Sequence, residues 1–347
     1  MRLPVPIPYG ACAVILLLGF MSGSRAGEEN VDRPDTVLAY QRDCGGWPKN
    51  YDRKRELSSA ERETLKGERA TSDATIDNGA TYTEIRILAQ AFARGGDQRF
   101  RKAAEAGIDY LLASQLPSGG WPQRFPEGRG YAKQITFNDN AMVGVLRLLK
   151  RIADGHRDFD FLSVQTRERC GKAVERGVSC ILRCQVAVGG ELTVWCAQHD
   201  RETFLPCRAR SYELPSLSGS ESVGIVRFLM ELEDPSPGVV LAIESAVSWF
   251  EKSKLTGIRL EKRIDSKRAN GFDHVVVKDM KAPPLWARFY DLKSNQPFFC
   301  GRDGVARRSL AEIPHERRTG YSWLGPYARE LLAEDFPGWR QRNPGRR

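Results

Sequence analysis

Apolar residues recur at helical spacing in three successive stretches of this chain. In each stretch an apolar-rich helix begins at a polar residue, a second helix follows, and a glycine-containing loop returns the chain. The first helix, for example, places Ile85, Leu88, Ala89 and Phe92 on one face. The predicted pairs are 78–94 with 98–115, 139–154 with 166–185, and 220–233 with 238–255. We therefore predict a mainly α protein, an α/α toroid of three helical hairpins with one helix of each pair inside.

The segments on either side of the hairpins have different patterns. Residues 27–74 are charged and mostly irregular, with one helix predicted over 58–66. After the third hairpin, 258–262 and 274–278 have the character of strands, and the rest is loop-rich and dense in Arg, Trp and Tyr. We predict a catalytic domain over 75–347. Its small, irregular, partly β C-terminal extension, from about residue 258, is expected to cover the mouth of the ring.

The first 26 residues have the pattern of a secretory signal peptide. Arg2 precedes an apolar stretch over 11–20, and Ser24-Arg25-Ala26 provides small residues for cleavage. The apolar stretch is short for a membrane span, although a membrane anchor is the alternative. No second apolar run follows, so we expect a secreted protein, extracellular or periplasmic, with no membrane association after cleavage.

The charge balance favours an acidic partner. The chain has 53 Lys+Arg against 44 Asp+Glu, a formal net charge of +9, and the predicted signal peptide removes two arginines and no acid. The sequence contains no zinc-finger spacing and no dense Lys/Arg tract, so nucleic acid is disfavoured. Export instead favours an acidic polysaccharide as the partner.

Acidic residues stand at the predicted start of the first helix in every hairpin. They are Asp77, Asp139 and Glu221. In a ring these positions gather at one mouth, where helix N-termini favour negative charge. They are either functional carboxylates or ordinary N-caps, and position alone leaves both open.

Nine short segments in order resemble the family 10 polysaccharide lyases, which are pectate lyases. The resemblance runs from about Cys44 to Trp339. The segments are GGWPK at 45–49, TIDN at 75–78, GGWPQ at 119–123, FNDN at 137–140, WCAQHD at 195–200, RSYELPS at 210–216, WARFY at 286–290, RDG at 302–304 and RRTGYSW at 317–323.

The resemblance implies calcium-assisted β-elimination of polygalacturonate. By motif match, Asp77, Asn78 and Asp139 lie at the metal, and their oxygens suit Ca²⁺. The resemblance also implies an arginine base in the C-terminal part. Arg302 is the preferred base and Arg288 the carboxylate clamp, with the reverse order left open.

Further residues of these segments are predicted to contact the substrate. Arg210 would grip a uronate with two hydrogen bonds, Glu213 would orient it or be structural, and Lys49 would add a point charge. Four aromatic residues would either offer flat faces to pyranose rings or belong to the core: Tyr212, Tyr321, Trp47 and Trp121. The protein is expected to act as a monomer.

Two other functions of the protein stay open at this stage. A glycoside hydrolase of similar fold would use two carboxylates such as Asp77 and Asp139, and a non-catalytic protein would only bind an acidic glycan. The Arg-rich C-terminal part fits a hydrolase poorly.

His199 is either a general acid or a hydrogen-bonded loop histidine, and the loop at 188–192 is expected to shape subsites.

Overall fold

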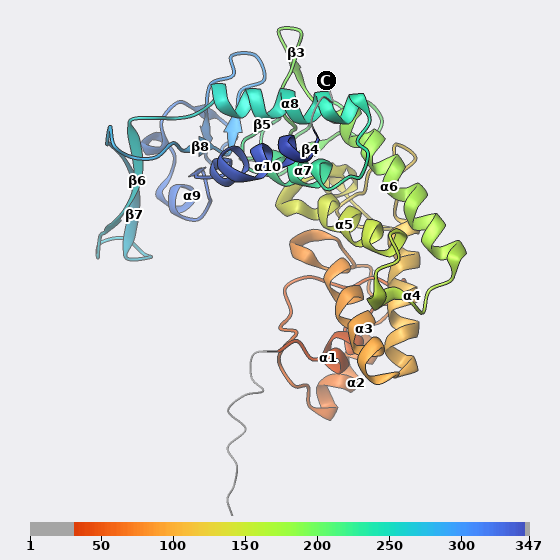
Figure 1. Ribbon diagram of the computed structural model, residues 1–347. Coiled ribbons are helices and arrows are strands. Elements are labelled where there is room, and N and C mark those ends of the chain that lie inside the picture. Colours follow the sequence, from red (N-terminus) through yellow and green to blue (C-terminus); the bar gives the residue numbers. More distant parts are fainter. Residues whose placement is uncertain (1–30, 344–347) are drawn as a thin grey trace, which may run out of the picture. The chain divides into compact units, whose positions relative to one another are not determined.

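Helices make up most of the regular structure in the computed structural model, which describes residues 31–343 (Figure 1). The predicted signal peptide lies outside the described residues. From Asp32 onward the chain forms one compact unit. Within residues 31–343, no helix has the length and apolarity needed to cross a membrane.

The order of elements follows the predicted alternation of helices and loops. The helices are α1 (Pro34–Ala39), α2 (Ser59–Gly67), α3 (Tyr82–Gly95), α4 (Gln98–Ala113), α5 (Ala141–Ala153), α6 (Val164–Cys184), α7 (Glu221–Met230), α8 (Pro237–Lys252), α9 (His315–Thr319) and α10 (Phe336–Arg342). Short helical turns are η1 (Asp77–Gly79), η2 (Gly130–Lys133), η3 (Asn138–Asn140), η4 (Arg157–Phe159), η5 (Leu310–Glu312) and the π-helical turn η6 (Leu331–Asp335).

The strands are short except in one hairpin. They are β1 (Ile135–Thr136), β2 (Ala187–Val188), β3 (Glu191–Leu192), β4 (Gln198–His199), β5 (Leu217–Ser218), β6 (Ile258–Ile264), β7 (Phe272–Lys278), β8 (Trp286–Ala287), β9 (Phe289–Tyr290), β10 (Phe299–Cys300), β11 (Ala306–Arg307) and β12 (Leu324–Gly325). All pair antiparallel in two-stranded sheets, so the mainly α fold class is confirmed.

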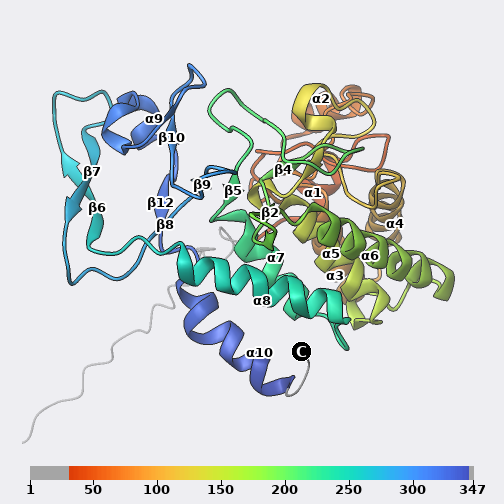
Figure 2. The same cartoon turned by 90° about the horizontal axis from the view of Figure 1, so that it is seen from above.

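The three predicted hairpins are α3–α4, α5–α6 and α7–α8, and they pack side by side in two layers. One layer contains α3, α5 and α7, and the other contains α4, α6 and α8, as the two views in Figures 1 and 2 agree. The apolar stripe explains this packing: Ile85, Leu88 and Ala89 on α3 are buried and Phe92 is half-buried. The predicted capping box of α2, between Ser58 and Glu61, is also present.

A tryptophan that precedes each helix pair forms a hydrogen bond with the helix before it. Trp47, Trp121 and Trp195 are fully buried, and their indole N–H groups donate at 2.7–2.8 Å to carbonyls of α1, α4 and α6, respectively. Trp47 and Trp121 therefore belong to the core, and neither offers a face to a sugar ring. The backbone carbonyls of the three tryptophans accept from the amides of Thr75, Thr136 and Ser218 at 3.0, 3.1 and 2.7 Å. The chain therefore contains a structural repeat that begins with α1, earlier than the hydrophobic pattern alone indicates.

Two glycines of α6 provide a test of the packing between helices. A Cβ atom at Gly177 would lie 2.5 Å from Cδ2 of Leu146 and 3.1 Å from Cζ3 of Trp121, whereas at Gly171 its nearest neighbour would be 3.7 Å away. We expect Gly177→Ala to lower the free energy of unfolding by about 1–3 kcal/mol through overpacking. The matched control Gly171→Ala should be neutral or stabilising by about 0.5–1 kcal/mol. Urea denaturation followed by circular dichroism measures both, and equal effects would contradict close packing at Gly177.

The C-terminal extension joins the third hairpin through short strands. β6 and β7 form the hairpin predicted at 258–262 and 274–278, with Ile258 opposite Lys278. β9 of the extension pairs with β5, which directly precedes α7. The amide of Gly219 also donates to the carbonyl of Arg288 at 2.9 Å. These contacts bring the extension to the start of an inner-layer helix.

Candidate active site

Two tight turns position the acids that precede α3 and α5. The helices begin later than predicted, at Tyr82 and Ala141, because η1 and η3 come before them. Asn78 (φ 53°) and Asp139 (φ 50°) are both left-handed, a conformation that Asn and Asp tolerate better than most residues. Asp77 therefore corresponds in the repeat to Asn138, not to Asp139. The N-caps of α3, α5 and α7 are Thr81, Asn140 and Ser220, so none of the three predicted acids caps its helix and the N-cap alternative is wrong.

Of the three acids predicted to gather at one mouth, Asp77 and Asp139 line one small pocket, whereas Glu221 does not line it. The turns η1 and η3 contact each other, and α7 contacts η3. The pocket has a volume of about 90 Å³ and is lined by Lys49, Asp77, Asn78, Gln123, Tyr131, Asn138, Asp139, Gln198, Ala209, Arg210 and Glu213. All three metal candidates and three of the five substrate-contact candidates therefore lie together.

Each repeat contributes a polar side chain to this pocket just after its tryptophan. Lys49 and Gln123 follow Trp47 and Trp121 by two residues, and Gln198 follows Trp195 by three. The sequence analysis missed Gln123, Asn138 and Gln198. The recurring offset from tryptophan was the signal that marks the two glutamines.

The two pocket aspartates have different surroundings. Asp77 is buried, and its Oδ2 accepts from Nζ of Lys49, while its Oδ1 is buried without a hydrogen-bond partner. Asp139 is more exposed and accepts from Nδ2 of Asn138 at 2.7 Å and from Nη2 of Arg288 at 3.3 Å. Asn78 donates through Nδ2 to Oδ1 of Asn50 at 3.1 Å. The pocket thus holds a carboxylate oxygen to which no group of residues 31–343 donates.

Arg288 contacts Asp139 from the interior of the protein and is almost fully buried. Its Nη2 donates to Glu221 and to Asp139, and lies 3.4 Å from Oδ1 of Asn138. Its guanidinium carbon is 4.7 Å from the ring centroid of Tyr321. Burial is the largest single influence and lowers the pKa of Arg288, but Glu221, Tyr321 and Asp139 together outweigh it, so the pKa lies above the ordinary value. Arg288 is therefore a fixed cation beside Asp139.

Arg210 is the arginine that lines the pocket itself. Its Nε donates to Oε2 of Glu213 at 2.8 Å and its Nη2 to Oε1, while Tyr321 donates its hydroxyl to the same Oε1 at 2.8 Å. The hydrogen bonds to Glu213 raise the pKa of Arg210 above its ordinary value. Among the hydrogen bonds of residues 31–343, none engages Nη1 of Arg210. This nitrogen is available to a ligand.

Arg302 and Tyr212 do not line the pocket. Arg302 is exposed and pairs with Glu316, with Nη2 to Oε1 at 2.7 Å. Its guanidinium carbon is 5.8 Å from the ring of Tyr212, which is buried and also packs against Arg210 and Arg317. The preference for Arg302 as base stays a prediction, but its contacts are with Glu316 and Tyr212 and not with the pocket acids.

His199 is held as a neutral, buried histidine. Its Nε2 accepts from the amide of Cys196 at 3.0 Å, so Nδ1 carries the proton and donates to the carbonyl of Phe204 at 2.7 Å. Burial lowers the pKa of His199 from 6.5 to about 4. This geometry fits the loop-histidine interpretation and leaves no free ring nitrogen for acid catalysis.

His199 is expected to make folding stability depend on pH. The unfolded chain binds a proton near pH 6.5 and the folded chain only near 4, so stability is present above 6.5 and falls as pH drops toward 4. The shift corresponds to about 3 kcal/mol. Urea denaturation at several pH values should show a shallower decline in His199→Gln than in the wild type. An identical slope in both proteins would contradict the neutral buried state.

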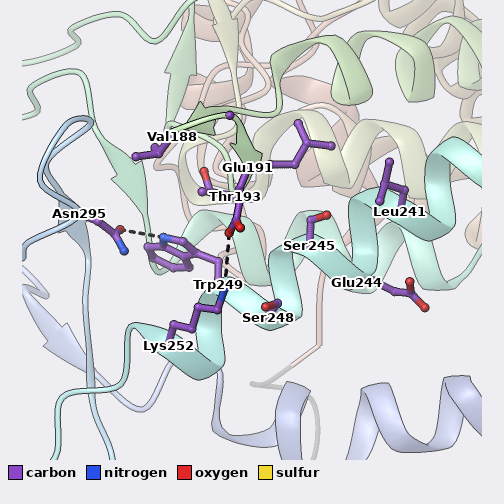
Figure 3. A pocket seen from close by; sticks show the side chains of 12 residues that line it. Val188, Glu191, Thr193, Leu241, Glu244, Ser245, Ser248, Trp249, Lys252 and Asn295 are labelled. Carbon is purple, nitrogen blue, oxygen red and sulfur yellow. Dashed lines mark hydrogen bonds and ion pairs between the residues drawn. The ribbon is translucent and has the colours of Figure 1, made fainter.

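A larger hollow than the acid pocket lies elsewhere, on the outer layer (Figure 3). It has a volume of about 720 Å³ and runs between the β2–β3 hairpin and α8. Trp249 donates through Nε1 to Oδ1 of Asn295 at 2.8 Å, and Nζ of Lys252 lies 3.5 Å from Oε2 of Glu191. Dashed lines in Figure 3 mark both contacts. The loop at 188–192, predicted to shape subsites, lines this hollow and not the acid pocket.

A polar pocket that combines acids, a lysine and an arginine has the composition of an enzyme active site, and the comparisons with known proteins identify the family. A family model described as pectic acid lyase matches residues 41–332. A mutant family 10 polysaccharide lyase from Cellvibrio cellulosa, in complex with trigalacturonic acid, is 37% identical with a TM-score of 0.77, over 89% of this chain and 91% of that chain. The same organism's family 10 polysaccharide lyase is 36% identical with a TM-score of 0.74, over 89% and 90%. No curated protein sequence matches. The chain belongs to the pectic acid lyase family, the family 10 polysaccharide lyases, and is a lyase.

Proposed function

We propose that this protein is a secreted, monomeric pectate lyase that cleaves polygalacturonate by calcium-assisted β-elimination. The observation that carries the proposal is a single small pocket that combines Asp77, Asp139, Lys49 and Arg210, with Arg288 directly behind it. The relative bound to trigalacturonic acid supports the substrate class. The positive side chains suit uronate carboxylates, and the predicted signal peptide is the basis for secretion.

The donor set of the pocket fits a calcium ion. Oδ1 of Asp77 is buried and has no donor, which is a costly arrangement unless a cation or a ligand group faces it. Asp77 and Asp139 would hold the ion through hard carboxylate oxygens, with the Asn78 amide at the rim. Within residues 31–343, no group of three or more His, Cys, Asp or Glu side chains is placed to hold a metal. We therefore expect substrate carboxylates to complete the coordination.

The reaction removes a proton from C5 of a galacturonate and expels the sugar at C4. The C5–H bond breaks, its electron pair forms the C4–C5 double bond, and the C4–O bond breaks with its pair on the departing oxygen, which takes a proton from water. Negative charge develops on the C5 carboxylate, where Arg288 and Lys49 stabilise it. A bound calcium ion adds Lewis-acid stabilisation of that carboxylate.

Arg210 is the base that the geometry supports best. It lines the pocket, and its Nη1 is not engaged by Glu213. Arg288 donates to Glu221 and Asp139, Arg302 pairs with Glu316, and neither arginine lines the pocket. A guanidinium must lose a proton before it accepts one, and Glu213 opposes that loss. Activity should consequently rise toward alkaline pH.

Incubation with polygalacturonate, with and without a calcium chelator, tests the function. A lyase gives products with a new ultraviolet absorbance and a mass one water lower than hydrolysis products. The chelator should abolish product formation, and added calcium should restore it. Saturated products would identify a glycoside hydrolase, and binding without products would identify a glycan-binding protein. An unchanged rate after chelation would remove the metal from the proposal.

A further inference from the structure

Glu221 is a buried carboxylate at the start of α7 that does not line the acid pocket. It is 4% exposed, and Ser218 holds it from two sides: the Ser218 hydroxyl donates to Oε2, and the Glu221 amide donates to Oγ of Ser218 at 3.1 Å. Its remaining carboxylate oxygen, Oε1, accepts from Nη2 of Arg288. The side chain is thus rigid, and its charge faces an arginine of the site.

Arg288 connects Glu221 to the pocket. One nitrogen, Nη2, faces both Oε1 of Glu221 and Oδ1 of Asp139, the latter at 3.3 Å. Tyr321 packs on the guanidinium with 4.7 Å between the guanidinium carbon and the ring centroid. The position of Arg288 is therefore set by a carboxylate on one side, an aromatic face on another, and Asp139 at its tip.

We infer that Glu221 is a positioning residue that holds Arg288 in place when a cation occupies the pocket at Asp139. This inference rests on the proposed calcium-dependent function. Without Glu221, Asp139 is the one carboxylate that neutralises Arg288, so Arg288 and a divalent cation compete for the same oxygen. With Glu221 present, Nη2 of Arg288 lies closer to Glu221 than to Asp139, so most of the arginine charge is balanced by Glu221 and Asp139 can exchange its longer contact with Arg288 for the cation. Glu221 acts only through Arg288 and touches no reacting atom.

The test removes the charge of Glu221 and keeps its shape. Glu221→Gln should raise the calcium concentration for half-maximal activity about tenfold. The binding readout is calorimetric titration of calcium into enzyme saturated with trigalacturonate, in an Arg210→Ala background that suppresses turnover. It should show the same weakening. Circular dichroism and melting temperature verify that the variant is folded.

Two further variants separate positioning from a general structural effect. Glu231→Gln, just beyond the other end of α7, removes an exposed carboxylate paired with Arg147 and should leave calcium affinity unchanged. In an Arg288→Gln background, Glu221→Gln should produce no additional loss of calcium affinity, because its effect passes through Arg288.

Failure of the inference differs from failure of the function. If the wild type forms unsaturated products with calcium, but Glu221→Gln has unchanged calcium affinity, the positioning role is overturned. A full effect of Glu221→Gln in the Arg288→Gln background overturns it as well. If the wild type forms no unsaturated product, the proposed function itself fails.

Discussion

Replacing Arg210 by lysine is expected to lower kcat on polygalacturonate about a thousandfold, the size typical of losing a positioned base. Lysine keeps the positive charge beside Glu213 but has no second terminal nitrogen to point into the pocket. Because Nη1 of Arg210 is free while Nε and Nη2 are held by Glu213, the arginine offers a proton acceptor whose position is fixed. Initial rates followed by ultraviolet absorbance give kcat and KM separately, and kcat should carry the loss.

Two matched substitutions decide what the Arg210 result means. Arg147→Lys changes another arginine that binds one glutamate through Nε and Nη2, outside the pocket, and should leave kcat unchanged. Arg302→Lys tests the base preferred from the sequence, and we expect it to lower kcat by less than tenfold, because Arg302 pairs with Glu316 at the surface. A large loss of kcat in Arg302→Lys, with Arg210→Lys near wild type, would reverse the assignment.

The fold was largely predictable because hydrophobic periodicity survives in every main helix. The spacing of Ile85, Leu88 and Ala89 predicted α3, and the same pattern located the other five hairpin helices. It did not predict α1, α9 or α10, whose 5–7 residues are too few to show a period. Hydrophobic periodicity also did not reveal the tryptophan repeat, because the repeat consists of single hydrogen bonds between residues that are not neighbours in the sequence.

The site was predictable in composition but not in arrangement. Conspicuous motifs located Asp77, Asp139 and Arg210, which do converge. The left-handed turns were not foreseen, and they make Asn138, not Asp139, the counterpart of Asp77. The choice between Arg210 and Arg302 depends on how the loops after α6 return to the pocket, and local sequence contains no information on that path. The packing of Tyr212 against guanidinium groups was not foreseen either, and its contact with substrate stays a prediction.

Asp77→Asn is expected to lower kcat/KM at low calcium by at least about a hundredfold, because the pocket loses the one buried carboxylate oxygen that has no donor. An amide oxygen binds calcium more weakly than a carboxylate, so high calcium should recover part of the activity. Measuring kcat/KM across a calcium series gives the half-saturating concentration, which should rise with the substitution. The matched control Asp73→Asn removes a carboxylate that pairs with Arg42 outside the pocket and should leave the calcium dependence unchanged.

The ion pair between Asp77 and Lys49 allows a second explanation, which a double substitution resolves. Asp77→Asn also leaves Lys49 without its carboxylate partner, so a misplaced lysine would impair substrate binding without changing the calcium requirement. If calcium binding is the main role, Lys49→Met combined with Asp77→Asn keeps the raised calcium requirement. If the lysine is responsible, the single Asp77→Asn variant loses activity at an unaltered half-saturating calcium concentration, and the cation site must then depend on Asp139 alone.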